Sequence, residues 1–111
     1  LHLSSAASDV YKRQMYVFHE DHVTQLPPEC RLLGSTKACK IASFAKDDHI
    51  FTTQSHPEFS YEFMSCVLRF SESEIPKNVV EGAWSSMKQD QHGHIFGTWC
   101  ANFFKKGLRN A

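Results

Sequence analysis

Short runs of β-branched and aromatic residues, separated by polar breaks, occupy the first half of the chain. Residues 15–18 (MYVF) and 30–35 (CRLLGS) each have the composition of a β-strand. Residues 40–45 alternate apolar and polar side chains, and residues 50–54 are rich in β-branched residues. Because the polar residues 46–49 separate them, these last two runs predict a hairpin.

After residue 60 the apolar residues recur with the period of a helix. Ser60 suits the N-cap of a helix over residues 61–70. Pro76 suits the first turn of a second helix that ends near residue 88. Gly107 suits the C-cap of a third helix. Aromatic side chains at helical spacing are expected in the core or between helices, rather than in a ligand cage: Trp84, Phe96, Trp99, Phe103 and Phe104.

Strands followed by helices are typical of an α+β domain or of a fragment of a larger α/β domain. The few short strands predict a thin sheet, which would leave apolar surface of the helices uncovered. The pattern therefore favours the fragment.

Residues 1–14 differ from the rest, because they are polar and show neither helical nor strand periodicity. Residues 9–14 (DVYKRQ) also resemble the translation of a transposon-end adapter used in sequencing libraries. We therefore expect residues 1–14 to be a non-native or disordered leader and residues 15–111 to form one partial domain. A native N-terminus that is disordered or helical is the alternative.

Twelve basic and twelve acidic side chains balance, so no long-range field favours nucleic acid or an anionic membrane. No apolar run reaches the length of a membrane span, and no signal peptide is recognisable. The cysteines show no CxxC pair, and we expect reduced thiols in a cytoplasmic protein: Cys30, Cys39, Cys66 and Cys100.

The strongest chemical signal is the tetrapeptide His56-Pro57-Glu58-Phe59, between a predicted strand and a predicted helix. Pro57 fixes its own φ and favours an extended His56, so Glu58 can reach the imidazole. A carboxylate on one ring nitrogen selects the tautomer and leaves the other nitrogen free to take a proton from a nucleophile. His56 and Glu58 therefore suit two members of a nucleophilic triad, although a surface ion pair at a turn is the simpler alternative.

Residues 53–60 (TQSHPEFS) resemble the Q-x-HPE-F segment of class I glutamine amidotransferases. Residues 19–23 (HEDHV), followed by Leu26-Pro27, resemble that family's H-x-D-x-V…LP segment. Residues 33–44 and the closing Trp99…Phe104 segment resemble the GMP-synthase-like branch. The similarity covers about residues 15–111.

The resemblance implies the C-terminal part of a flavodoxin-like (Rossmann-like) domain that hydrolyses the side-chain amide of glutamine and needs no cofactor. A cysteine would attack the amide, His56 would act as base and then as acid, and Glu58 would orient His56. His19, Asp21 and Gln54 would lie at the rim of the glutamine pocket. An ammonia-accepting synthase domain or subunit is the implied partner.

One departure from the family pattern is decisive, because none of the cysteines lies in the G-x-C-x-G context of the family's nucleophile. We expect this polypeptide alone to lack glutaminase activity. A non-catalytic binding or regulatory module of the same fold is the first alternative. A metal-dependent hydrolase, in which His19, Asp21 and His22 join His56 and Glu58 as ligands, is the second. His92 and His94, which flank Gly93, are assigned no function.

Overall fold

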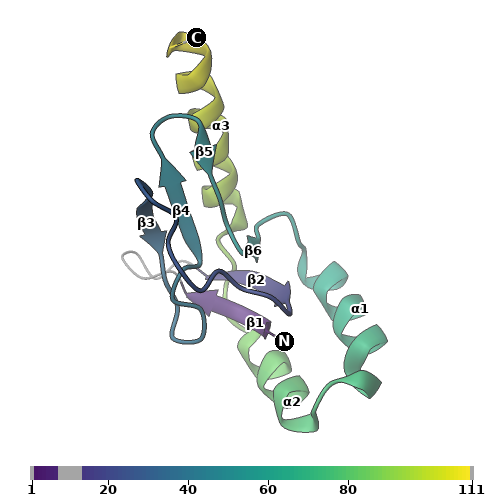
Figure 1. Ribbon diagram of the computed structural model, residues 1–111. Helices are drawn as coiled ribbons and strands as arrows, with labels where there is room; N and C mark the ends of the chain where they lie inside the picture. The colour runs from purple at the N-terminus through teal and green to yellow at the C-terminus, as the bar shows by residue number, and fades with distance from the viewer. Residues whose placement is uncertain (1, 8–13, 111) are drawn as a thin grey trace.

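The computed structural model describes residues 2–7 and 14–110 of the chain, with the side chains of residues 14–108. Within this part the protein is α/β, with two small sheets and three α-helices (Figure 1). All paired strands described are antiparallel. The strands precede the helices along the chain, as the sequence predicts.

The first sheet has the strand order β1-β2-β6. It consists of β1 (His2–Ala7), β2 (Gln14–His19) and β6 (Ser55–His56). Strand β2 confirms the strand predicted at residues 15–18. Residues 2–7 pair with β2 as a strand, and the interpretation of residues 1–14 as a non-native or disordered leader remains a prediction. Residues 8–13, which carry most of the adapter-like sequence, lie outside the described residues.

The second sheet has the order β3-β4-β5. It consists of β3 (Arg31–Gly34), β4 (Ser43–Lys46) and β5 (Ile50–Phe51), and the β4–β5 hairpin is confirmed. Both hairpin strands are shorter than predicted. Beyond β5 the pairing continues irregularly, because the Thr52 and Gln54 backbone amides donate to Phe44 and Ala42 at 2.9 and 2.8 Å.

Helices α1 (Tyr61–Ser71) and α2 (Lys77–Ser86) confirm the two predicted helices after residue 60. A short 3-10 helix, η1 (Glu72–Glu74), joins them. The Ser60 hydroxyl accepts the backbone N–H of Phe63 at 3.1 Å, which confirms the predicted N-cap. Pro76 is the N-cap of α2, one position before the first-turn site predicted for it.

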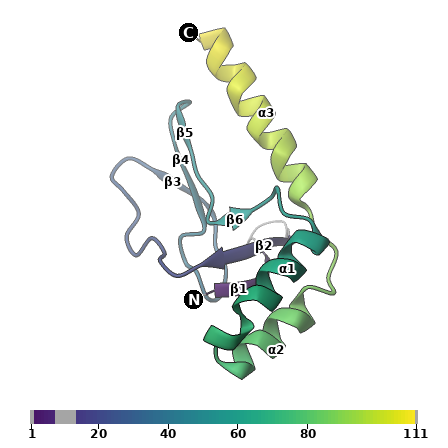
Figure 2. The ribbon, with the colours of Figure 1, turned by 90° about the vertical axis from the view of Figure 1, so that its right-hand side faces the viewer.

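The main core lies between β2 and the α1–α2 pair (Figure 2). Its side chains are apolar and buried: Tyr16, Met64, Leu68, Ile75, Val80, Ala83 and Met87. Trp84 packs against this cluster from its edge, as predicted, and the guanidinium of Arg69 lies 5.5 Å from its ring centroid. The core therefore fixes the face of the first sheet on which α1 and α2 lie.

Helix α3 (Gly93–Asn110) projects from this core and runs beside the β4–β5 hairpin (Figure 1). The Phe96 ring stacks on Phe51 at a centroid distance of 5.1 Å, and the Lys106 ammonium lies 2.9 Å from the Asp48 carboxylate. The prediction that Gly107 caps the helix is wrong, because the helix continues through it to Asn110.

The aromatic residues of α3 divide between core and surface. Phe96 is 4% exposed, whereas Trp99 is 36% and Phe104 is 68% exposed. The prediction of packed side chains is therefore confirmed for Phe96 and wrong for Phe104. Among the described residues, no helix has the length and apolar character needed to cross a membrane.

Candidate active site

The His56-Pro57-Glu58-Phe59 turn leaves the first sheet at the end of β6 and leads into α1 (Figure 2). His56 lies directly opposite Tyr16 of β2 in the antiparallel register. The turn is closed by the Phe59 backbone amide, which donates to the His56 carbonyl at 3.2 Å. Residue 56 is therefore held by the strand on one side and by the turn on the other.

His56 and Glu58 are brought together as the sequence predicts. The His56 Nδ1 atom lies 2.8 Å from Glu58 Oε1. An ionised carboxylate can only accept hydrogen bonds, so Nδ1 carries the proton and donates a hydrogen bond to Glu58. The neutral ring then has its lone pair on Nε2, and no hydrogen bond to that atom is formed by the described residues. This is the tautomer that a general base requires.

Phe59 holds the His56 ring from its face. The two rings stack with centroids 4.1 Å apart and an interplanar angle of 8°. Phe63, one turn into α1, meets Phe59 edge-on at 4.6 Å. The imidazole is thus oriented by a carboxylate at its edge and an aromatic ring on its face. The sequence motif contained Phe59 but gave no sign of this stacking.

The dyad is open to solvent on one side, because the His56 side chain is 34% and the Glu58 side chain 64% exposed. Burial raises the pKa of the Glu58 carboxyl, but the hydrogen bond from His56, a backbone hydrogen bond and the His56 charge together outweigh burial. The net result is a pKa below the ordinary value of 4.5. Glu58 is therefore ionised at neutral pH, as an orienting group must be.

A lowered pKa in the folded state predicts a specific dependence of stability on pH. Glu58 should contribute stability above its unfolded pKa, and this contribution should be lost as the pH falls through the folded pKa. The substitution Glu58→Gln should remove this contribution, so the difference in free energy of urea unfolding between the two proteins should be present at neutral pH and narrow as the pH falls below 4.5. Glu74→Gln, at an exposed position of η1, is the control. Parallel pH profiles for wild type and Glu58→Gln would contradict the prediction.

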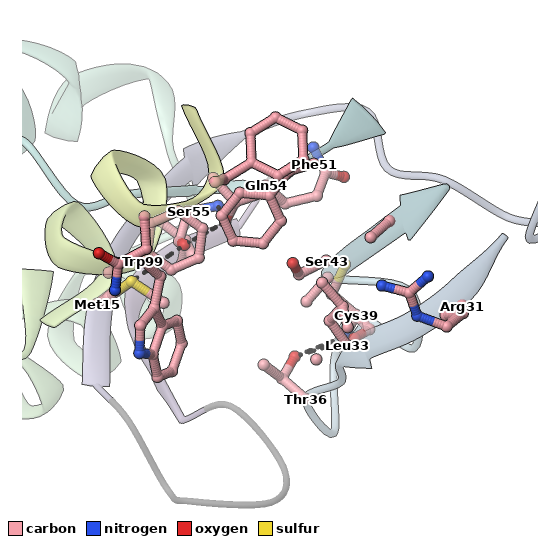
Figure 3. Close-up of a pocket in the computed structure, with 18 of the residues that line it drawn as sticks. Met15, Arg31, Leu33, Thr36, Cys39, Ser43, Phe51, Gln54, Ser55 and Trp99 are labelled. Carbon is pink, nitrogen blue, oxygen red and sulfur yellow. Dashed lines mark hydrogen bonds between the residues drawn. The ribbon is translucent and has the colours of Figure 1, made fainter. Parts of the chain in front are cut away.

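An apolar cavity of about 500 Å³ lies on the other face of the first sheet. Met15 and Trp99 face it from one side, and Leu33, Thr36 and Cys39 face it from the other (Figure 3). Neighbouring strand residues point to opposite faces of a sheet. Ser55, opposite Val17, lines the cavity, whereas His56, opposite Tyr16, is on the α1–α2 face.

The structure places two of the three predicted rim residues at this cavity. His19 and Gln54 both line it. The Nδ1 atom of His19 lies 2.7 Å from the Asp21 carbonyl oxygen, so Asp21 meets His19 through its backbone. The Gln54 Oε1 atom is buried and accepts no hydrogen bond from the described residues. The rim role of all three remains a prediction.

The proposed metal ligands do not form a donor cluster. Among the side chains that the structure describes, no group of three or more His, Cys, Asp or Glu residues is placed to hold a metal ion. His19 and His22 approach each other as tilted rings with centroids 6.5 Å apart. The described side chains therefore give the metal-dependent hydrolase hypothesis no geometric support.

All four cysteines are free thiols. Burial raises the pKa of Cys39 more than a hydrogen bond from the Ile41 backbone lowers it, and burial also raises the pKa of Cys100. Since the thiolate is the nucleophile, a raised pKa makes a thiol less reactive. Neither thiol has the activated character of a catalytic nucleophile.

The sequence missed one neighbour of the turn, the His92-Gly93 segment at the start of α3. The His92 ring accepts the Gln14 backbone amide through Nδ1 at 2.9 Å, and a Cβ atom added at Gly93 would overlap the Pro57 carbonyl oxygen. A glycine flanked by histidines is an ordinary turn signal. Nothing in the local sequence marks its contact with Pro57.

Comparison with known proteins relates the chain to gamma-glutamyl peptidases, GMP synthases and a glutamine amidotransferase-like protein. It is 33% identical to gamma-glutamyl peptidase 3 of Arabidopsis thaliana over 94 residues, which cover 78% of this chain and 36% of that protein. It is 32% identical to the glutamine-hydrolysing GMP synthase of Ectopseudomonas mendocina over 92 residues, or 74% of this chain and 18% of that enzyme. A glutamine amidotransferase-like protein of Schizosaccharomyces pombe is 37% identical over 51 residues, or 46% of this chain and 21% of that protein.

No family model matches the chain, and no solved structure matches it significantly. The chain spans about a third of the length of the gamma-glutamyl peptidases that it matches. Its matches nevertheless agree on one family, and they agree with the resemblance carried by the His56-Pro57-Glu58-Phe59 turn. The homologues of the chain are therefore GMP synthases and gamma-glutamyl peptidases, which belong to the class I glutamine amidotransferase family.

Proposed function

We propose that residues 15–111 form the C-terminal part of a flavodoxin-like, class I glutamine amidotransferase domain. In this proposal the whole domain hydrolyses the side-chain amide of glutamine in the cytoplasm and passes ammonia to a synthase domain or subunit. The observation that carries the proposal is the 2.8 Å contact between His56 Nδ1 and Glu58 Oε1 in a proline-stiffened turn. The matches to glutamine-hydrolysing GMP synthases support it.

In the proposed mechanism His56 moves the protons and Glu58 orients it. Nε2 takes the proton of a cysteine thiol as the sulfur attacks the amide carbon of the substrate. The imidazolium, stabilised by the Glu58 carboxylate, then protonates the departing nitrogen, so ammonia leaves and a γ-glutamyl thioester remains. His56 next takes a proton from the attacking water, and the thioester is hydrolysed to glutamate and free thiol.

The nucleophile of this proposal lies outside residues 15–111. The four thiols of the chain lack the glycine context of the family's nucleophile, and burial raises the pKa of two of them. We therefore expect the 111-residue chain to be inactive by itself. Its contribution to the whole domain is the base and the carboxylate that orients it.

Hydrolysis of a γ-glutamyl peptide bond is a second candidate function. Two gamma-glutamyl peptidases of Arabidopsis thaliana each match 78% of the chain, compared with 43–74% for the GMP synthases. The same thiol, imidazole and carboxylate would cleave either bond, since both join a γ-glutamyl carbonyl carbon to nitrogen. The leaving group, an amine rather than ammonia, distinguishes the two.

A chimera tests the proposal. Residues 15–111 would replace the matching segment of the Ectopseudomonas mendocina GMP synthase or of gamma-glutamyl peptidase 3. Glutamate release should be at background for the 111-residue chain and measurable for a folded chimera, with glutamine or a γ-glutamyl dipeptide as substrate. Circular dichroism and gel filtration would establish folding. Folded but inactive chimeras would favour the non-catalytic module, and glutamate release by the chain alone that is lost in His56→Ala would place the nucleophile within it.

A further inference from the structure

The start of α3 is joined to β2, the strand that pairs with β6 beside the dyad. The His92 backbone amide donates to the Gln14 carbonyl at 2.7 Å, and the Gln14 amide donates to His92 Nδ1 at 2.9 Å. These two bonds close a ring between residues 78 positions apart. Because β2 also pairs with β6 at Tyr16 and His56, the same strand holds both the dyad and the start of α3.

Gly93 follows this anchor and packs directly against the turn. A Cβ atom at residue 93 would overlap the Pro57 carbonyl oxygen and lie 3.0 Å from its carbonyl carbon. The obstacle is backbone, which cannot swing aside as a flexible side chain could. The described glycines with nothing within 4 Å of an added Cβ are Gly82, Gly97 and Gly107, so Gly93 differs from the other glycines in helices.

Backbone conformation does not explain this glycine. None of the described glycines has a positive φ, so residue 93 does not need the left-handed region that only glycine enters freely. The reason for a glycine at position 93 is therefore the close approach of two backbones, that of Pro57 and that of α3.

We propose that Gly93, anchored by His92, is a positioning residue that fixes the Pro57 peptide and so aligns His56 with Glu58. Pro57 lies between the two members of the dyad, so any displacement of its carbonyl rotates one side chain relative to the other. The turn is then held from three directions, by β2, by the Phe59 ring and by α3. The catalytic meaning of this alignment rests on the proposed function, but the alignment can be measured without activity.

The test compares Gly93→Ala with Gly97→Ala, the same exchange one turn further along α3. Nitrogen-15 NMR of the 111-residue chain reports the tautomer of the His56 ring, and carbon-13 NMR reports the titration of the Glu58 carboxyl. Wild type and Gly97→Ala should keep the proton on Nδ1. Gly93→Ala should lose this preference and move the Glu58 titration toward that of an unpaired glutamate. Unchanged signals in a folded Gly93→Ala protein would overturn the proposal.

A second pair of variants keeps the test decisive if Gly93→Ala does not fold. His92→Ala removes the acceptor for Gln14, whereas His92→Asn supplies an oxygen acceptor near the position of Nδ1. The proposal expects His92→Ala to disturb the His56 tautomer and His92→Asn to restore it. If His92→Ala is folded with an unchanged tautomer, or if His92→Ala also unfolds, the segment supports the fold in general and the proposal fails.

The active chimera separates this proposal from the proposed function. There Gly93→Ala should lower kcat by roughly 10–100-fold with little change in KM, because misplacement of a catalytic group slows the chemical step. Gly97→Ala should leave kcat unchanged. If no chimera is active, the proposed function fails while the NMR result still decides the role of Gly93. If an active chimera keeps its kcat in Gly93→Ala, the alignment has no catalytic consequence and the proposal fails.

Discussion

Replacing His56 with alanine in an active chimera should lower the rate of γ-glutamyl hydrolysis by about 10²–10⁴-fold, the usual contribution of a general acid–base group. The neutral ring holds its proton on Nδ1, 2.8 Å from Glu58 Oε1, and keeps its lone pair on Nε2. Alanine removes the group that accepts the thiol proton and later protonates the leaving nitrogen. The loss should appear in kcat, since His56 acts on the nucleophile rather than on substrate binding.

Steady-state release of glutamate measures this loss, with two variants for comparison. Glu58→Gln keeps a hydrogen-bond acceptor but removes the negative charge that stabilises the imidazolium, so its rate should fall less than that of His56→Ala. His49→Ala changes an exposed histidine in the turn between β4 and β5 and should leave kcat unchanged. A His56→Ala chimera within about fivefold of its parent would refute the assignment of His56 as the base, because such a loss is below the usual range.

The contact between His56 and Glu58 could be predicted because the two residues are close in sequence. Pro57 has a fixed φ and restricts the backbone of the residue before it, so the side chains of His56 and Glu58 can adopt few relative positions. Ser60 was recognisable for the same reason, since an N-cap depends on a bond to an amide three residues away. Contacts between residues only two or three positions apart can therefore be predicted from the residue types alone.

The long-range contacts could not be predicted in this way. His92 and Gln14, 78 positions apart, form a hydrogen bond. Gly93 lies against the backbone of Pro57, and no pattern of residue types in the sequence indicates this contact. The division into two sheets also escaped prediction, because the pairing of β2 with β1 and β6 depends on the fold as a whole. Gly107 suited a helix end by its type, yet the helix continues through it, since propensity is a weak guide to where a helix stops.

Leu68→Ala should have the largest effect on stability, lowering the free energy of unfolding by about 2–5 kcal/mol. Leu68 is 0% exposed in the cluster that joins α1 and α2 to Tyr16 of β2. Truncation removes apolar contacts and leaves a cavity in a core that cannot close around it. A small domain is stable by only about 5–15 kcal/mol, so the loss would be a large share of the total.

Phe70→Ala is the matched control, because it removes a larger apolar side chain from the same helix at a position that is 91% exposed. Its free energy of unfolding, from urea titration, should stay within about 0.5 kcal/mol of wild type. Equal losses in the two variants would contradict the packing of α1 on β2. Tyr16 lies opposite His56 in the ladder, so the core borders the dyad. In the proposal above, the turn and Gly93 set the His56 tautomer and the Glu58 titration, so folded Leu68→Ala should keep both while it unfolds at a lower urea concentration.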